Sequence, residues 1–194
     1  MSDSALPPRP TLPSDEALTI ALVASEFNPE FTDALVFHAR TELEAISPAV
    51  TIQTVRVPGA FEIPLAVELI AARCEVDAVI AFGVILEGET AHAMLLAESV
   101  TASLQQIGLR YYVPVLHGVL LMKNREQAEV RCQGEELNRG VEMARSAVAT
   151  VQALKPLRTA LARGGRGPVG FQSRGSRRLA VEEGAQGKGG RVGG

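Results

Sequence analysis

Four short apolar runs recur along the chain, and a longer segment with helical spacing of apolar residues follows each of them. Three of the runs are nearly continuous, which is typical of strands buried on both faces of a sheet, whereas the second alternates between apolar and polar residues. The predicted strands cover residues 18–24, 51–57, 77–84 and 113–120. The predicted helices cover residues 30–46, 61–73, 92–107, 124–132 and 135–154.

Strands that alternate with helices of this length indicate βαβ units and a parallel sheet. Right-handed crossovers would place helices on both faces, so we expect an α/β protein with a three-layer α/β/α sandwich and a four-stranded parallel sheet. In such sheets, ligands bind outside the carboxyl ends of the strands. This rule nominates three loops for the functional site: residues 25–28, 58–62 and 85–92.

The two ends of the chain differ in composition from its centre. Residues 1–17 are polar and Pro-rich, so we expect an extended N-terminal arm before a domain at 18–157. Residues 158–194 are rich in Gly and Arg and contain few large apolar side chains, so we expect a disordered tail. Few aromatic residues lie among the Arg and Gly residues of the tail, so we interpret it as a solvated tail rather than as an RNA-binding segment. A frameshifted end is the alternative to a genuine tail.

The net charge of −3 is an average of two unlike parts. The tail at 158–194 has eight basic and two acidic residues, so the rest of the chain carries −9. No apolar stretch reaches the roughly 18 residues of a membrane span, and the N-terminus lacks a signal-peptide pattern, so we expect a cytoplasmic protein. Cys74 and Cys132 stand apart from any CxxC or Cys/His cluster, so we interpret them as free thiols and expect no metal site.

The loop at 83–92 follows a buried strand and opens a helix, which is where backbone N–H groups can bind a phosphate. Gly88 would let the backbone approach closely, and Thr90 could cap the helix and donate its hydroxyl. The negative charges of Glu87 and Glu89 would repel a phosphate bound in this loop unless their side chains point away from it. His92, at the mouth of this site, could transfer protons near neutral pH.

Each of these signals also has an ordinary structural interpretation. His92 could be a surface histidine at a helix start, and Phe27 could belong to the core. Glu62 could be a first-turn acid that favours the helix dipole, and Arg131 a solvated helix residue. The order of these residues along one chain favours the functional interpretation over the structural one.

That order resembles the successive signatures of lumazine synthases over roughly residues 18–154. The segments at 57–64 (VPGAFEIP) and 88–92 (GETAH) are the most specific. The other matching features are Ser25-x-Phe27-Asn28, residues 77–83, 113–115, 118–120 and 126–128, Arg131 and residues 138–140.

The resemblance implies a flavodoxin-like fold and the condensation of 5-amino-6-(D-ribitylamino)uracil with 3,4-dihydroxy-2-butanone 4-phosphate, without a cofactor. His92 would shuttle protons. Phe27 would stack on the pyrimidinedione. The ribityl chain would lie along Ala60, Phe61 and Glu62. The remaining implied substrate-binding residues are Val84, Ile85 and His117, and the implied phosphate-binding residues are Glu89, Thr90 and, from an adjacent subunit, Arg131.

The family also implies a homo-oligomer: a pentamer, which in some members assembles further into a sixty-subunit shell. Riboflavin synthase is a candidate partner, and neither a membrane nor a specific nucleic acid is expected to bind. Departures from the family pattern put affinity and rate in question: Glu87, Ala93, His117, Leu121 and Met122. The alternative is therefore a weakly active or inactive homologue that forms a shell or binds flavin. A flavodoxin-like binding domain would not explain the two specific segments.

Overall fold

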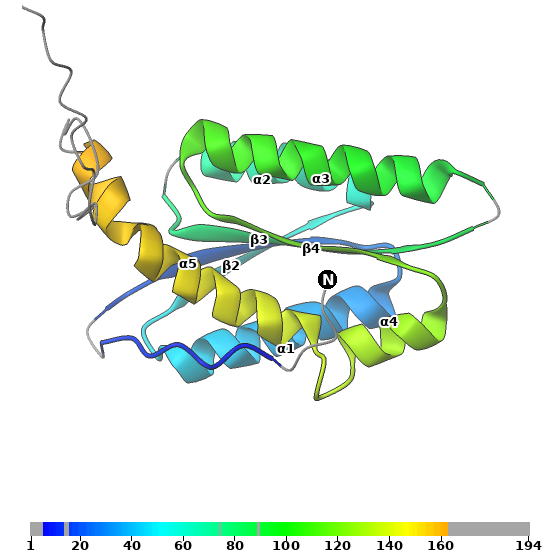
Figure 1. Ribbon diagram of the computed structural model, residues 1–194, viewed down its shortest axis with the longest axis horizontal. Helices are drawn as coiled ribbons and strands as arrows, with labels where there is room; N and C mark the ends of the chain where they lie inside the picture. Colours follow the sequence, from blue (N-terminus) through cyan, green and yellow to red (C-terminus); the bar gives the residue numbers. More distant parts are fainter. Residues whose placement is uncertain (1–5, 14–15, 74, 89, 163–194) are drawn as a thin grey trace, which may run out of the picture.

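The central element of the protein is a parallel sheet of four strands. The computed structural model describes residues 6–13, 16–73, 75–88 and 90–162. The strands lie in the order β2-β1-β3-β4 (Figure 1). Their bounds are β1 Thr19–Ser25, β2 Thr51–Val57, β3 Ala78–Leu86 and β4 Val115–Met122. All three neighbouring pairs are parallel, as the alternation of strands and helices predicted.

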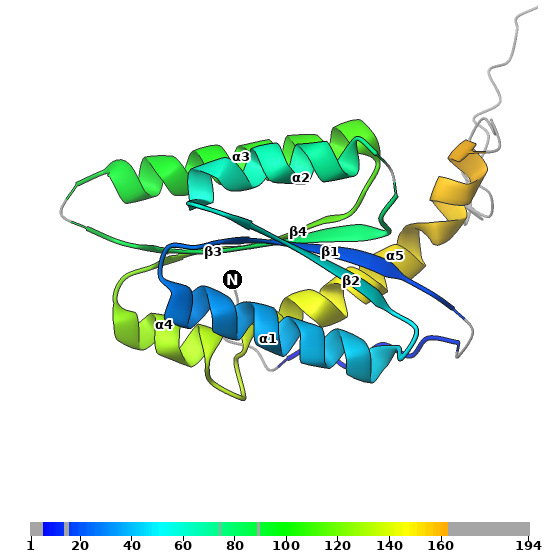
Figure 2. The same cartoon turned by 180° about the vertical axis from the view of Figure 1, so that it is seen from behind.

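Helices cover both faces of the sheet, which confirms the predicted three-layer sandwich. Figures 1 and 2 show α1, α4 and α5 on one face and α2 and α3 on the other. The bounds are α1 Pro29–Ile46, a short 3-10 turn η1 Ala60–Glu62, α2 Ile63–Ala71, α3 His92–Tyr111, α4 Arg125–Cys132 and α5 Arg139–Ala162.

Burial along the strands explains why their sequences differ. Almost every residue of β1 and β3 is buried, because these strands lie in the middle of the sheet with helices on both sides. Strand β2 is exposed along most of its length, since it is an edge strand. Two of the continuous apolar runs, β1 and β3, thus belong to the centre of the sheet, and the alternating run β2 belongs to one edge. The third continuous run is β4, the other edge strand, which is only partly buried.

Several element boundaries differ from the prediction, among them both ends of β4, which was predicted at 113–120. Strand β3 continues to Leu86, so Ile85 belongs to a strand rather than to a loop. Helix α3 continues to Tyr111 and ends where Tyr112 adopts a left-handed conformation. Helix α5 begins at Arg139, where the side-chain oxygen of Asn138 accepts a hydrogen bond from the Val141 N–H (3.1 Å) and so caps the helix.

The far end of α5 includes residues that we expected in the tail. The helix runs through Pro156 to Ala162, so residues 158–162 are helical. Residues 163–194 of the predicted tail lie outside the described residues. Within the described part of the chain, no helix combines the length and apolarity needed to span a membrane.

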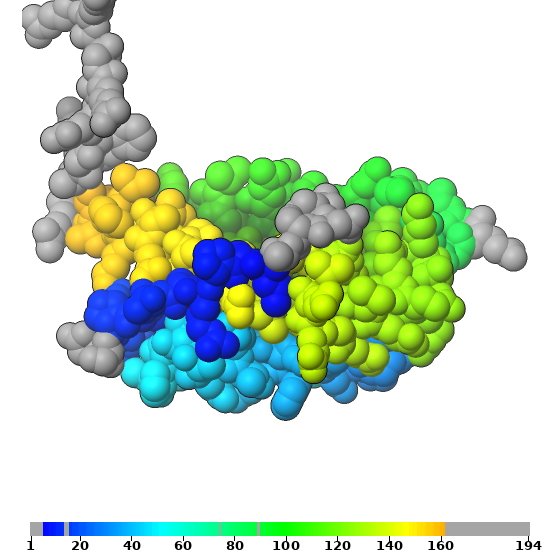
Figure 3. Space-filling view, turned by 60° about the horizontal axis from the view of Figure 1, so that its bottom comes forward, coloured from blue at the N-terminus to red at the C-terminus, as the bar shows by residue number. Residues whose placement is uncertain are grey.

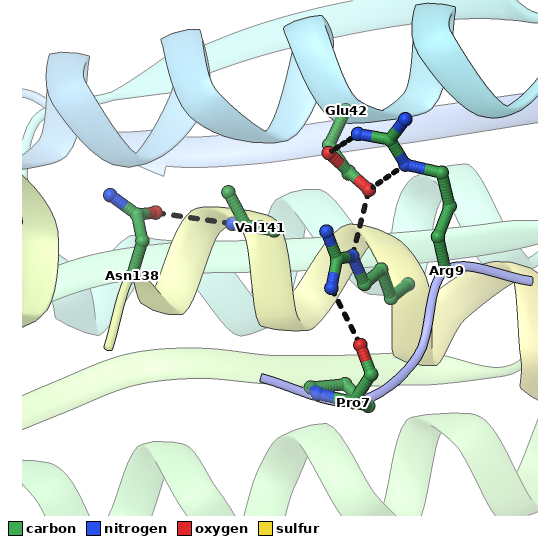
Figure 4. A network of polar contacts seen from close by, with 6 residues as sticks. Pro7, Arg9, Glu42, Asn138 and Val141 are labelled. Carbon is green, nitrogen blue, oxygen red and sulfur yellow. Dashed lines mark hydrogen bonds and ion pairs between the residues drawn. The ribbon is translucent and has the colours of Figure 1, made fainter. Parts of the chain in front are cut away.

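The N-terminal segment at 6–13 has neither helix nor strand and lies against α1 and α5. Figure 3 shows it in dark blue across the surface of these helices. Arg9 forms two hydrogen bonds with Glu42 of α1, and the Pro7 carbonyl accepts from Arg145 of α5 (Figure 4). The Thr11 carbonyl accepts from Gln152 of α5. Contacts along its length therefore fix the path of this segment.

Candidate active site

A cavity of about 320 Å³ lies at the carboxyl ends of β1 and β3. The three loops nominated from the sequence all contribute to it, together with the first turns of α3. Its lining residues are Ser25, Phe27, Asn28, Gly59, Ala60, Phe61, Glu62, Val84, Ile85, Leu86, His92 and Leu96. The structure thus brings together seven of the predicted site residues: Phe27, Ala60, Phe61, Glu62, Val84, Ile85 and His92.

The loop after β1 holds Phe27 at the mouth of the cavity. Its side chain is 71 % exposed, which is unusual for a large apolar ring. The next residue, Asn28, has left-handed dihedrals (φ 54°), a conformation that Asn tolerates better than most residues. The Asn28 side-chain amide donates to the Val84 carbonyl oxygen (2.8 Å) and so ties this loop to β3.

The loop after β2 places a carboxylate beside that ring. A β-carbon at Gly59 would lie 2.9 Å from the Glu62 Oε2 atom and 3.6 Å from the Phe27 ring. A side chain at this position would displace the Glu62 carboxylate from its present place beside the backbone, whereas it would only touch the Phe27 ring. Phe61 is 68 % exposed, so the cavity has an aromatic ring on two sides.

His92 is the first residue of α3 and is exposed at the cavity. Its backbone N–H donates to the Thr90 hydroxyl over 3.4 Å. The cap position is Ala91, so the expectation that Thr90 caps the helix was wrong by one residue. Thr90, Gly88 and Glu87 are exposed in the same loop, whereas Glu89 lies outside the described residues.

Two predicted site residues lie outside this cavity. His117 is on β4, where its Nε2 atom is 2.8 Å from the Thr101 hydroxyl. Thr101 comes nine residues after His92 in α3, roughly 13 Å along the helix axis. Arg131 lies on α4, across the sheet from α3 (Figure 1). One chain alone does not bring these two side chains to His92.

The contact with Thr101 fixes the protonation of His117. The Thr101 hydroxyl donates its single hydrogen to the Ala97 carbonyl (2.7 Å), so toward His117 it can only accept. Nε2 of His117 therefore carries a hydrogen. Burial lowers the pKa of His117, which favours the neutral ring near pH 7.

The charge of the cavity bears on which ligands it can hold. None of the described residues that line it is Lys or Arg, and Glu62 contributes a carboxylate. Backbone N–H groups at the start of α3 offer only a partial positive charge. An anionic group bound here would gain from a cation supplied by another chain.

Five lining residues were missing from the predicted set: Ser25, Asn28, Gly59, Leu86 and Leu96. Asn28 and Gly59 belong to the segments that carried the resemblance. Asn28 also has a signal of its own, because it is a polar residue directly after an exposed aromatic residue. Leu86 and Leu96 carry no such signal, because leucines in strands and helices are usually core residues.

Cys132 is a buried free cysteine, as predicted, and burial raises the pKa of its thiol to about 12. It therefore stays protonated and unreactive near neutral pH. Cys74 lies outside the described residues. Among the described residues, no group of three or more His, Cys, Asp or Glu side chains could hold a metal ion.

Comparisons with known proteins agree with this geometry. The family model described as 6,7-dimethyl-8-ribityllumazine synthase matches residues 17–155. The chain belongs to this family. A 6,7-dimethyl-8-ribityllumazine synthase of Coxiella burnetii (strain Dugway 5J108-111) is 35 % identical over 74 % of this chain and 96 % of its own length.

Two other members of the lumazine synthase family give the same result. The Stenotrophomonas maltophilia (strain R551-3) protein is 37 % identical over 75 % of this chain and 95 % of its own length. The 6,7-dimethyl-8-ribityllumazine synthase 1 of Caulobacter vibrioides is 36 % identical over 72 % of this chain and 92 % of its own length. The match thus covers the sandwich and stops within α5, before its last two turns.

Proposed function

We propose that this chain is a transferase of riboflavin biosynthesis that condenses 5-amino-6-(D-ribitylamino)uracil with 3,4-dihydroxy-2-butanone 4-phosphate. The products are 6,7-dimethyl-8-ribityllumazine, phosphate and water. One observation carries this proposal: residues from three segments that are far apart in the sequence line a single cavity. The departures at Glu87 and Ala93 leave this cavity intact, so we favour an active enzyme over an inactive homologue.

Different regions of the site suit the two substrates. The exposed Phe27 ring offers a flat face for the pyrimidinedione. Glu62 lies close to that ring and can accept hydrogen bonds from the ribityl hydroxyl groups. The phosphate would lie at the start of α3, where Gly88, Thr90 and backbone N–H groups are available.

The chemistry requires positioning and proton transfer. The pyrimidine amine attacks the ketone, and loss of water gives an imine. Elimination then releases phosphate, and ring closure with a second loss of water yields the lumazine. Holding both substrates in one cavity supplies much of the acceleration, and His92 moves protons between the reacting groups.

We further propose that the complete site is shared between subunits. No Arg or Lys lines the described cavity, while His117 and Arg131 lie elsewhere on the chain. A second copy could present both residues to this cavity. Arg131 would then bind the phosphate, and His117, with its hydrogen on Nε2, would contact the bound substrate.

The assembly that provides these contacts would be a pentamer at minimum, and a sixty-subunit shell is its larger form. We place the reaction in the cytoplasm. Riboflavin synthase, which consumes the product, is the candidate partner.

Mixing the purified protein with both substrates tests the proposal. We expect the absorbance and fluorescence of the lumazine to appear together with inorganic phosphate in equal amounts. Each substrate alone is the control. If a folded, assembled protein gave no product while still binding added lumazine, the inactive homologue would be the correct interpretation.

A further inference from the structure

Ser25 is a buried polar residue at the floor of the cavity. It is the last residue of β1 and is 1 % exposed. Its hydroxyl oxygen has no hydrogen-bond partner among the described residues. Such atoms are rare in folded proteins, because a buried hydroxyl without a partner loses its bonds to water and gains nothing in return.

The surroundings of Ser25 explain why the chain itself offers no partner. A β-carbon placed on Gly83 would lie 3.4 Å from the Ser25 oxygen, 3.2 Å from Ile63 and 3.3 Å from Val119. The hydroxyl thus lies near the part of Gly83 that faces Ile63 and Val119, and neither of these side chains has a polar atom. Ser25 also lines the cavity, together with Phe27 and Ala60.

We propose that Ser25 is a specificity-determining residue whose hydroxyl forms a hydrogen bond with the ribitylamino-pyrimidinedione. This inference rests on the proposed function and adds a residue to it. Serine has one side-chain torsion with three staggered positions, so rotation about a single bond turns the hydroxyl toward a ligand. A polar edge of the bound substrate then satisfies the group that the free protein leaves unpaired.

The position of Ser25 selects the pyrimidine rather than the phosphosugar. Ser25 is two residues before Phe27, on the strand whose end carries the proposed stacking ring. The proposed phosphate site is on another element, at the start of α3. A hydrogen bond from Ser25 therefore discriminates among pyrimidines and leaves phosphate recognition unchanged.

The Ser25→Ala variant distinguishes a binding role of Ser25 from a structural one, because the two roles predict different changes in the melting temperature and in the Kd. An unpaired hydroxyl contributes nothing to the free protein, so we expect its melting temperature to stay the same or rise. The Kd of 6,7-dimethyl-8-ribityllumazine, followed by its fluorescence, should increase about 3- to 10-fold. The KM for the pyrimidine should increase similarly, with kcat and the KM for the phosphosugar nearly unchanged.

Ser47→Ala is the matched control, because Ser47 is also buried but lies at the far end of α1, outside the cavity. We expect it to leave the Kd unchanged. A lower melting temperature of Ser25→Ala with an unchanged Kd would overturn the proposal and assign Ser25 a structural role. An unchanged Kd at unchanged stability would overturn it as well. If the wild-type protein neither bound the lumazine nor formed it, the proposed function itself would fail.

Discussion

At the scale of single residues, we predict that His92 serves proton transfer and Arg131 serves phosphate binding. His92 lies at the cavity and is exposed, so its ring contributes little to the folded core. We expect His92→Ala to lower kcat by about 10- to 1000-fold, since the substrates remain positioned without the proton shuttle. Steady-state kinetics with lumazine detection measures this loss, and the melting temperature should not change.

His38 offers a control for that experiment. It is a half-exposed histidine on α1 that contacts the Phe37 ring edge to face, away from the cavity. His38→Ala should keep wild-type kcat. Equal turnover of His92→Ala and wild type would exclude the assigned role of His92.

Arg131 is predicted to act on one substrate only. A guanidinium binds two phosphate oxygens through two parallel N–H donors in a fixed plane, a geometry that an ammonium group cannot reproduce. We expect Arg131→Lys to raise the KM for the phosphosugar about 10-fold or more, with a much smaller change in the KM for the pyrimidine. Separate titration of the two substrates gives both values.

Arg125 on the same helix is the control for Arg131. Its guanidinium pairs with Glu30 (2.6 Å) and lies over the Phe31 ring, so it is engaged within its own chain. Arg125→Lys should change neither KM. A similar rise in both KM values for Arg131→Lys would indicate a general loss of structure instead of a lost phosphate contact.

At the scale of elements, the N-terminal segment is held by a buried charge between two helices. Glu42 of α1 is 6 % exposed and pairs with Arg9 of the segment and Arg145 of α5, each at 2.7 Å. Hydrogen bonds from Arg9, followed by those from Arg145, lower the pKa of Glu42 despite its burial. The carboxylate thus joins three segments that are far apart in the sequence (Figure 4).

We expect Glu42→Gln to reduce the free energy of unfolding by about 1–3 kcal/mol near neutral pH, because two guanidinium groups lose their charged partner. A carboxyl group with a lowered pKa stabilises the fold above its ordinary pKa of about 4.3, and this contribution is lost as the pH falls toward the lowered value. Urea unfolding of both proteins between about pH 7 and pH 3 should show their difference shrinking.

The neighbouring Glu44 provides the comparison. It is 59 % exposed and lies 3.7 Å from Arg40 of the same helix. Glu44→Gln should change the free energy of unfolding by less than about 0.5 kcal/mol, as is usual for exposed pairs. An equally small effect of Glu42→Gln would mean that the contacts of Glu42 with Arg9 and Arg145 do not stabilise the fold.

At the scale of the whole molecule, the exposed surface of α2 and α3 supports an assembly. Large apolar side chains are exposed there, which is typical of protein interfaces. They are Leu65 (64 %), Leu69 (63 %), Leu95 (63 %) and Leu109 (70 %). Packing this surface against a second chain would remove these side chains from water. It could also bring His117 and Arg131 of a second copy to the cavity.

Light scattering should therefore give at least five times the 20.6 kDa mass of one chain. Residues 163–194 contain seven basic and two acidic residues, so five copies add about 25 positive charges to a pentamer. We expect a variant ending at Ala162 to assemble in the same way, but with a weaker dependence on salt, because this repulsion is screened only at high ionic strength. A monomer or dimer that kept full activity in both proteins would rule out a shared site.

The sequence determined the elements and most of the cavity. Its apolar runs predicted all four strands. For β1 and β3 the reason is that burial on both faces requires continuous apolar residues whatever the rest of the fold. The rule that ligands bind at the carboxyl ends of parallel strands then placed three loops together, and the structure confirms that they meet. These properties depend on local pattern and on general rules of chain topology.

Only the tertiary structure decided which distant groups touch. Asn28 bonds to Val84, Glu42 joins Arg9 to Arg145, and His117 pairs with Thr101 instead of facing His92. Gly140 is needed because a β-carbon there would lie 2.5 Å from the Leu35 carbonyl oxygen. The physical reason is that such contacts depend on how whole helices and strands pack, whereas hydrophobic periodicity records only whether each residue is buried, not against what.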